Sequence, residues 1–79
     1  MLVRFFAGAA EAAGCSSQEI DAYGRDVAAV TAALAEGNDR LARVLAVSAL
    51  LADGVRVTDA TQDLSGASHL DVLPPFAGG

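Results

Sequence analysis

The sequence predicts an α+β roll, in which one main helix packs across a small mixed sheet. Three observations lead to this fold class. Short segments of β-branched, aromatic and other apolar residues lie near both ends of the chain, at residues 2–7 and 69–73. The clearest helical periodicity lies between them, at residues 26–36. With 79 residues, the chain is expected to form a single domain with a slim core.

The first strand is expected at residues 2–7, where successive side chains alternate between the two faces of the sheet. Its core face would carry Val3, Phe5 and Ala7. Phe6 belongs to the other face, where it either fills a second apolar layer or contacts a partner. Residues 8–14 are alanine-rich between two glycines and predict one or two helical turns. Residues 16–21 are polar and predict a second strand near an edge of the sheet.

The main helix is predicted at residues 26–36. Asp26 is a good N-cap, because its carboxylate can accept a hydrogen bond from a free backbone N–H of the first turn. Gly37 is typical of the residue that follows a helix. The core stripe of this helix would be Val27, Val30 and Leu34. Asp39 is expected to cap a second, short helix. That helix would turn Leu41, Val44 and Leu45 inward and Arg40 and Arg43 outward.

A hairpin and a final strand complete the sheet. The hairpin is expected as a strand at residues 49–52, a tight turn at Asp53 and Gly54, and a returning strand at residues 55–57. Residues 58–68 are polar and predict a loop, which Leu64 would anchor to the core. The last strand is expected at residues 69–73 and is apolar enough to be buried.

Composition and charge exclude several classes of function. The net charge is −5, and the five basic residues are arginines that do not cluster, so the sequence shows no nucleic-acid-binding patch. The longest apolar run, residues 44–52, is too short to span a membrane. A lone cysteine, Cys15, and the absence of a signal-peptide pattern favour a cytoplasmic protein. The chain has no lysine and cannot receive an isopeptide bond on its own side chains.

No catalytic or metal-binding constellation is evident within the domain. The glycine spacings of phosphate-binding loops are absent. Cys15 has no candidate base beside it in the sequence. His69 is the only histidine, whereas a structural metal site needs about four ligands. We therefore expect no bound metal or cofactor, and a carrier or adaptor rather than a self-sufficient catalyst.

The chemically distinctive part of the chain is its end. Pro74 and Pro75 stop the last strand, because proline cannot donate a hydrogen bond to a sheet. Residues 76–79 can extend about 13 Å beyond them and finish on Gly78 and Gly79. The glycines alone also fit a frayed terminus without function. The order of strand, proline stop, short apolar spacer and glycine pair favours a thread that enters a narrow site on a partner.

Such a thread presents a terminal carboxylate, which is a poor acyl donor because oxide is a poor leaving group. The carboxylate of Gly79 must therefore first be activated, for example by transfer of AMP from ATP. Sulfur can then attack the mixed anhydride. Glycine suits this position, because its backbone can pass through a channel that any Cβ would block.

Taken together, these residues resemble the ubiquitin-like sulfur carriers, among them the small subunits of molybdopterin synthase. The resemblance is carried by residues 3–7, the helix from Asp26, the hairpin at residues 50–54 and the ending at residues 73–79. It covers essentially the whole chain, and its specific part is the Pro-Pro-x-x-Gly-Gly ending. It implies a β-grasp domain over residues 1–75 and an extended tail over residues 76–79.

The resemblance also implies a function. An ATP-dependent activating enzyme would adenylate Gly79, which would then become a thiocarboxylate. The chain would be the non-catalytic subunit of a heteromeric molybdopterin synthase and would give its sulfur to a pterin precursor. The tail would enter the active site of the large catalytic subunit through Pro74, Pro75, Phe76, Ala77 and Gly78. Phe6 matches an aromatic position in the family, which favours an apolar sheet surface that meets the large subunit.

Two departures from the family and several alternatives remain. Phe76 stands where the family more often has a smaller, β-branched residue, and residues 65–69 lack an acidic turn often found there. A related carrier could supply sulfur to thiamine, cysteine or tRNA synthesis. The chain could also be a protein-conjugating modifier, or a ubiquitin-like interaction domain with an idle tail. The proline stem favours the molybdopterin pathway among these.

Overall fold

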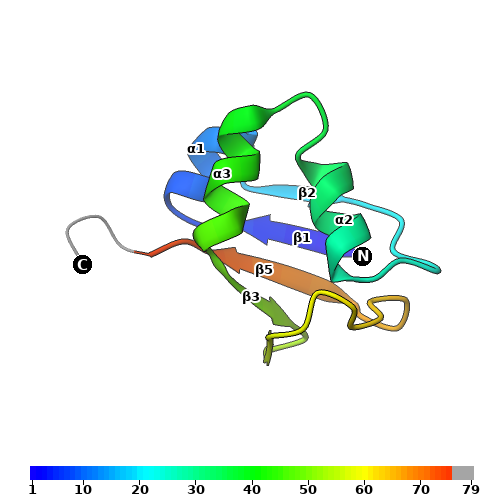
Figure 1. The fold of residues 1–79 in the computed structure, drawn as a ribbon. Coiled ribbons are helices and arrows are strands. Elements are labelled where there is room, and N and C mark those ends of the chain that lie inside the picture. The colour runs from blue at the N-terminus through cyan, green and yellow to red at the C-terminus, as the bar shows by residue number, and fades with distance from the viewer. Residues whose placement is uncertain (76–79) are drawn as a thin grey trace.

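The computed structural model describes residues 1–75, which form a five-stranded sheet and three helices (Figure 1). The strands are β1 (Leu2–Phe5), β2 (Ser17–Glu19), β3 (Ala49–Ala52), β4 (Val55–Val57) and β5 (His69–Leu73). The helices are α1 (Gly8–Ala13), α2 (Val27–Leu34) and α3 (Asp39–Val47). The predicted α+β class and the predicted order of elements are both confirmed.

The sheet is mixed, with strand order β2-β1-β5-β3-β4. The first and last strands, β1 and β5, lie side by side and run parallel, whereas all the other neighbouring pairs are antiparallel. β5 is therefore the central strand and is hydrogen-bonded along both edges. Two segments that are far apart in the sequence meet in this way at the middle of the fold.

The three helices lie on one face of the sheet, as Figure 1 shows, and the core fills the space between the two layers. Six side chains in this core are almost completely inaccessible to solvent: Leu41, Leu64, Leu70, Val3, Val30 and Val72. Leu64 is 1% exposed, so it anchors the long loop before β5 as predicted. No helix in residues 1–75 is long and apolar enough to cross a membrane.

The helix starts follow from local side-chain chemistry. Asp26 caps α2, because its carboxylate accepts a hydrogen bond of 2.8 Å from the backbone N–H of Ala29. The predicted cap at Asp39 is wrong by one residue. Asn38 is the N-cap of α3 and accepts from Leu41 N at 3.0 Å. Its side-chain amide also donates to the carbonyl of Ala12 at 2.8 Å, which ties α3 to α1.

Two further expectations differ from the structure in detail. β1 ends at Phe5, and Ala7 is exposed with a φ of 49°, so it does not extend the core face of the strand. The chain turns at Ala7 because α1 begins at the next residue. The helix expected to be short, α3, has nine residues, one more than α2. The predicted turn is confirmed, since Asp53 and Gly54 have φ values of 49° and 82°, as a type I′ hairpin requires.

Candidate functional site at the root of the tail

The C-terminal tail leaves the domain from the end of β5, the central strand, which is hydrogen-bonded along both edges. β5 pairs with β1 over residues 69–72 and with β3 over residues 70–73. Beyond β1, the backbone N–H of Phe6 donates to the carbonyl of Val72 at 3.2 Å. The side chain of Val72 is completely buried. The residues just before Pro74 are therefore held on both edges and on the core face.

The predicted tail residues fall into two groups. Pro74 is half-buried and Pro75 is exposed, and both are placed at the end of β5. Phe76, Ala77, Gly78 and Gly79 lie outside the described residues. The described part of the site is therefore the root of the tail.

A hollow of about 430 Å³ lies beside this root, and we name it the tail-root hollow. Its lining residues come from the start of α1, from α3 and from the proline pair: Ala7, Gly8, Glu11, Val44, Val47, Pro74 and Pro75. Figure 1 shows why these segments meet, since the last turn of α3 lies over the end of β5. No sequence pattern marks this hollow, because its walls come from three separate segments.

The face of the sheet opposite the helices is the second part of the site, and we name it the open face. Strand register places these side chains on it: Leu2, Arg4, Leu51, Arg56, Asp71 and Leu73. Phe6 follows β1 and lies beside the end of β5, with 41% of its surface exposed. The structure thus brings Phe6 and the proline stem to the same end of the sheet.

An ion pair crosses the middle of the open face. Arg4 donates from Nε to Oδ1 of Asp71 at 2.6 Å and from Nη2 to Oδ2 at 2.8 Å. These hydrogen bonds, and to a lesser extent the carboxylate charge, raise the pKa of Arg4 above its ordinary value. The two hydrogen bonds fix the orientation of the guanidinium group on the open face, where leucine side chains also lie. The sequence alone could not pair these residues, because 67 positions separate them.

A second carboxylate stabilises the other end of β5. Asp53 accepts hydrogen bonds from the backbone N–H groups of Ser68 and His69, each at 3.1 Å. These bonds, the one from Ser68 first, lower the pKa of Asp53 below its ordinary value. His69 Nδ1 also lies 3.3 Å from the same carboxylate. This histidine is therefore a structural partner of the hairpin turn.

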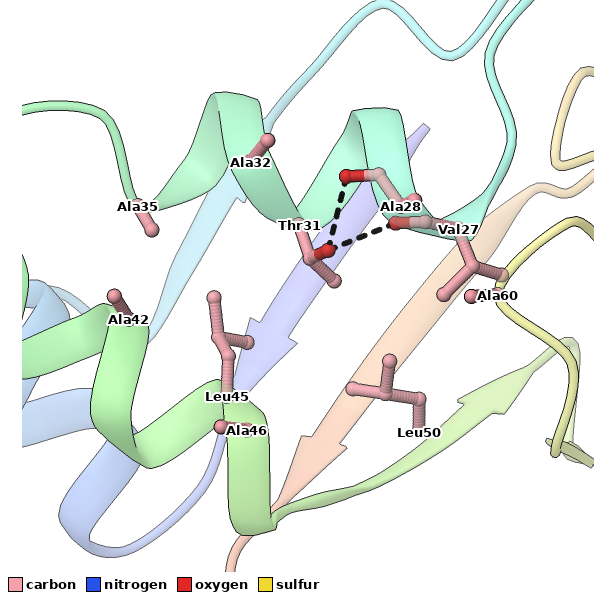
Figure 2. A pocket seen from close by; sticks show the side chains of 10 residues that line it. All are labelled: Val27, Ala28, Thr31, Ala32, Ala35, Ala42, Leu45, Ala46, Leu50 and Ala60. Carbon is pink, nitrogen blue, oxygen red and sulfur yellow. Dashed lines mark hydrogen bonds between the residues drawn. The ribbon is translucent and has the colours of Figure 1, made fainter.

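A larger hollow, of about 450 Å³, opens between α2, α3 and β3 on the helical side (Figure 2). Thr31 is its one residue with a polar side chain, and its Oγ1 donates to the carbonyls of Val27 at 2.9 Å and Ala28 at 3.1 Å. The hydroxyl is thus used within the helix. This hollow presents alanines, leucines and a valine, with no group that could activate a substrate.

The described residues contain no internal reaction centre. Among residues 1–75, no three histidine, cysteine, aspartate or glutamate side chains gather closely enough to hold a metal ion. Within the same range, every buried side-chain nitrogen or oxygen has a hydrogen-bond partner. Cys15 is exposed and unpaired with any other cysteine.

Comparisons with known proteins identify a family and a fold. The ThiS family matches residues 3–79, which includes the whole tail. No curated protein matches the chain. In the solved structures, SAMP1 from Haloferax volcanii is similar with a TM-score of 0.75 and 23% identity, and the match covers 99% of this chain and 97% of that one.

Two further solved structures are similar. A second structure of H. volcanii small archaeal modifier protein 1 has a TM-score of 0.72 and 21% identity, with 95% of each chain covered. The solution structure of the H. volcanii HVO 2177 protein has a TM-score of 0.71 and 27% identity, covering 99% of this chain and 84% of that one. The expected β-grasp fold is confirmed by these likenesses.

Proposed function

Because the chain belongs to the ThiS family of ubiquitin-like sulfur carriers, we propose that it carries sulfur on Gly79 for molybdopterin synthesis. The observation that supports this most strongly is the family match through residue 79, which includes the Pro-Pro-x-x-Gly-Gly ending. Carriers of this family form a C-terminal thiocarboxylate after activation by an adenylating enzyme related to ubiquitin-activating enzymes.

The chemistry proceeds in two steps at one carboxylate. An oxygen of the Gly79 carboxylate attacks the α-phosphorus of ATP, and pyrophosphate leaves. The resulting acyl adenylate has AMP as a good leaving group. A sulfide nucleophile then attacks the acyl carbon, the bond to AMP breaks, and the chain ends in a thiocarboxylate. If the donor is a persulfide, an acyl disulfide forms first, and a thiol must cleave its S–S bond, taking the donor sulfur into a new disulfide and leaving the thiocarboxylate. The activating enzyme supplies the site for both steps, while this chain supplies the acyl group and its presentation.

Presentation depends on how the tail is attached. The strand before it is held by β1 and β3, so the starting point of the tail is fixed relative to the body. Pro74 and Pro75 restrict the backbone to extended conformations over the next two positions. Gly78 and Gly79 then allow passage through a narrow channel, because they carry no Cβ. A partner that binds the body therefore receives Gly79 at a limited range of distances.

The open face and Phe6 are the proposed docking surface for the large catalytic subunit. Phe6 is 41% exposed and lies beside the root of the tail, so a partner that covers it also receives the proline stem. The ion pair of Arg4 and Asp71 lies farther along the same face. Side chains of mixed apolar and arginine character are typical of the central part of protein interfaces.

Intact mass spectrometry tests the carrier function. The full chain is incubated with an activating enzyme of the family, ATP and a sulfur donor. We expect a mass increase that matches replacement of one terminal oxygen by sulfur, and no increase for a chain that lacks Gly79. If a reference carrier is modified in the same mixture and this chain is not, the idle-tail alternative replaces the proposal.

A second measurement identifies the acceptor. The thiocarboxylated chain is mixed with the large subunit of molybdopterin synthase and its pterin precursor, and the dithiolene product is measured. Product formation supports the molybdopterin pathway. A loaded chain that transfers sulfur only in thiamine, cysteine or tRNA reactions would assign it to a related carrier. Adducts on lysines of other proteins would instead indicate a modifier.

A further inference from the structure

Helix α2 is apolar on every side, although part of it faces solvent. Its sequence over Val27–Leu34 contains no charged residue, and the hydroxyl of Thr31, its one polar side chain, is bonded within the helix. Ala28, Ala29 and Ala32 are nevertheless exposed. A helix that is apolar all round is typically buried. The exposed side of α2 therefore lacks the charged residues that solvent-facing helices normally carry.

This side of α2 forms one wall of the larger hollow, which we name the helix groove (Figure 2). Ala28 and Ala32 belong to that wall, and Ala42 and Ala46 of α3 line the groove opposite them. The buried side chain of Leu50 lies at the base. The walls consist largely of methyl groups, so the volume of about 450 Å³ can receive larger apolar side chains of another molecule.

Acidic residues gather at the end of the groove where α2 begins. The backbone N–H of Ala28 donates to the carbonyl of Ala60 at 3.0 Å, which holds the loop at residues 59–63 against the helix. Asp59 precedes Ala60 in this loop, and Asp63 forms a β-bridge with Asp26, the N-cap of α2. Hydrogen bonds from neighbouring residues lower the pKa of both loop aspartates, so both are charged at neutral pH.

The opposite end of the groove is also acidic. Glu36 directly follows the last lining residue from the α2 segment, and Asp39 begins α3 one turn before the lining resumes. Among the arginines near the lining in sequence, Arg40 is paired with a carboxylate of α1. Arg25 and Arg43 are then outnumbered by the carboxylates around the groove.

We infer that the helix groove binds an amphipathic helix of a partner protein, with apolar side chains in the groove and basic side chains at its acidic ends. Such a helix presents apolar residues at positions i, i+3, i+4 and i+7. A second copy of this chain fits less well, because its net charge of −5 places like charges together. The groove lies on the helical side of the sheet (Figure 1), so this partner leaves the open face accessible.

An NMR titration of the full chain with a designed peptide tests this binding. The peptide has about 18 residues, or about five helical turns, with leucines at the apolar positions and lysines elsewhere. A control peptide carries glutamate in place of every lysine. We expect saturable shifts of the methyl signals of the lining alanines with the lysine peptide. The glutamate peptide should bind at least about tenfold more weakly, because like charges then meet at both ends of the groove.

Two substitutions on α2 form a matched pair. Ala32 lines the groove and Ala29 does not, although both are exposed. Ala32→Arg and Ala29→Arg add the same charge, and arginine favours helix, so both variants should keep their melting temperature. Ala32→Arg fills the groove and should weaken binding of the lysine peptide at least about tenfold, whereas Ala29→Arg should weaken it no more than about twofold.

The absence of saturable shifts with the lysine peptide would overturn the inference, as would equal binding of the two peptides. Equal losses in the two variants, or shifts confined to the open face, would overturn it as well. Shifts of the lining alanines that depend on protein concentration without peptide would place a second copy in the groove instead. The titration needs no activating enzyme or acceptor, so a failure of the proposed sulfur-carrier function would leave its result unaffected.

Discussion

Replacing Val72 by alanine should destabilise the domain without impairing the tail. Val72 is completely buried in β5, and its replacement removes two methyl groups from the core. At about 0.8 kcal/mol per buried carbon, with a further contribution from the cavity, the loss is about 2–3 kcal/mol. A domain of 79 residues is expected to have a free energy of unfolding of about 4–12 kcal/mol. The substitution therefore removes a large fraction of the stability.

The assay is urea and thermal denaturation followed by circular dichroism, since the chain has no tryptophan. The midpoint temperature should fall by about 8–24 °C, from roughly 4–8 °C per kcal/mol for a domain of this size. Val55→Ala is the matched control, because Val55 is 69% exposed on β4 and should change stability by no more than about 0.5 kcal/mol. Below its melting temperature, Val72→Ala should still gain the thiocarboxylate. Equal losses in the two variants would refute the packing argument.

Four other substitutions test separate parts of the argument. Asp53→Asn should lower stability at neutral pH. A pH series of urea melts should show that the difference in stability from the unmodified chain vanishes as the pH falls through the lowered pKa of Asp53. Protonation of Asp53 removes the stabilisation that the substitution also removes. A difference in stability that persists in acid would contradict this. Asn38→Ala should cost about 1–2 kcal/mol in the same melts, and an equal cost for Asp39→Ala would show that the cap is misassigned. Gly78→Leu should block sulfur transfer while pull-down on the large subunit is retained, and loss of all binding would show that the tail supplies the affinity. Phe6→Ser should weaken that binding severalfold with an unchanged melting temperature, and unaltered affinity would remove Phe6 from the docking surface.

The strands could be predicted because their signals are local. Alternating apolar residues marked β1, and a short apolar segment marked β5, so the core roles of Val3 and Val72 followed from position alone. The pairing of the strands could not be predicted in this way. No pattern within either strand indicates that β1 and β5 are parallel neighbours, yet this pairing brings Arg4 to Asp71. The polar contact on the open face therefore depends on topology, which sequence periodicity does not contain.

The ends of the helices were harder to place. Asn38 and Asp39 are adjacent and both are good caps, so the sequence could not choose between them. In the structure, the amide of Asn38 has an advantage that a carboxylate lacks, because it accepts from its own helix and donates to Ala12 of α1. A tertiary contact thus determines which of the two residues caps α3. Ala7 shows the same effect, since the start of α1 ends the strand before the apolar alternation does.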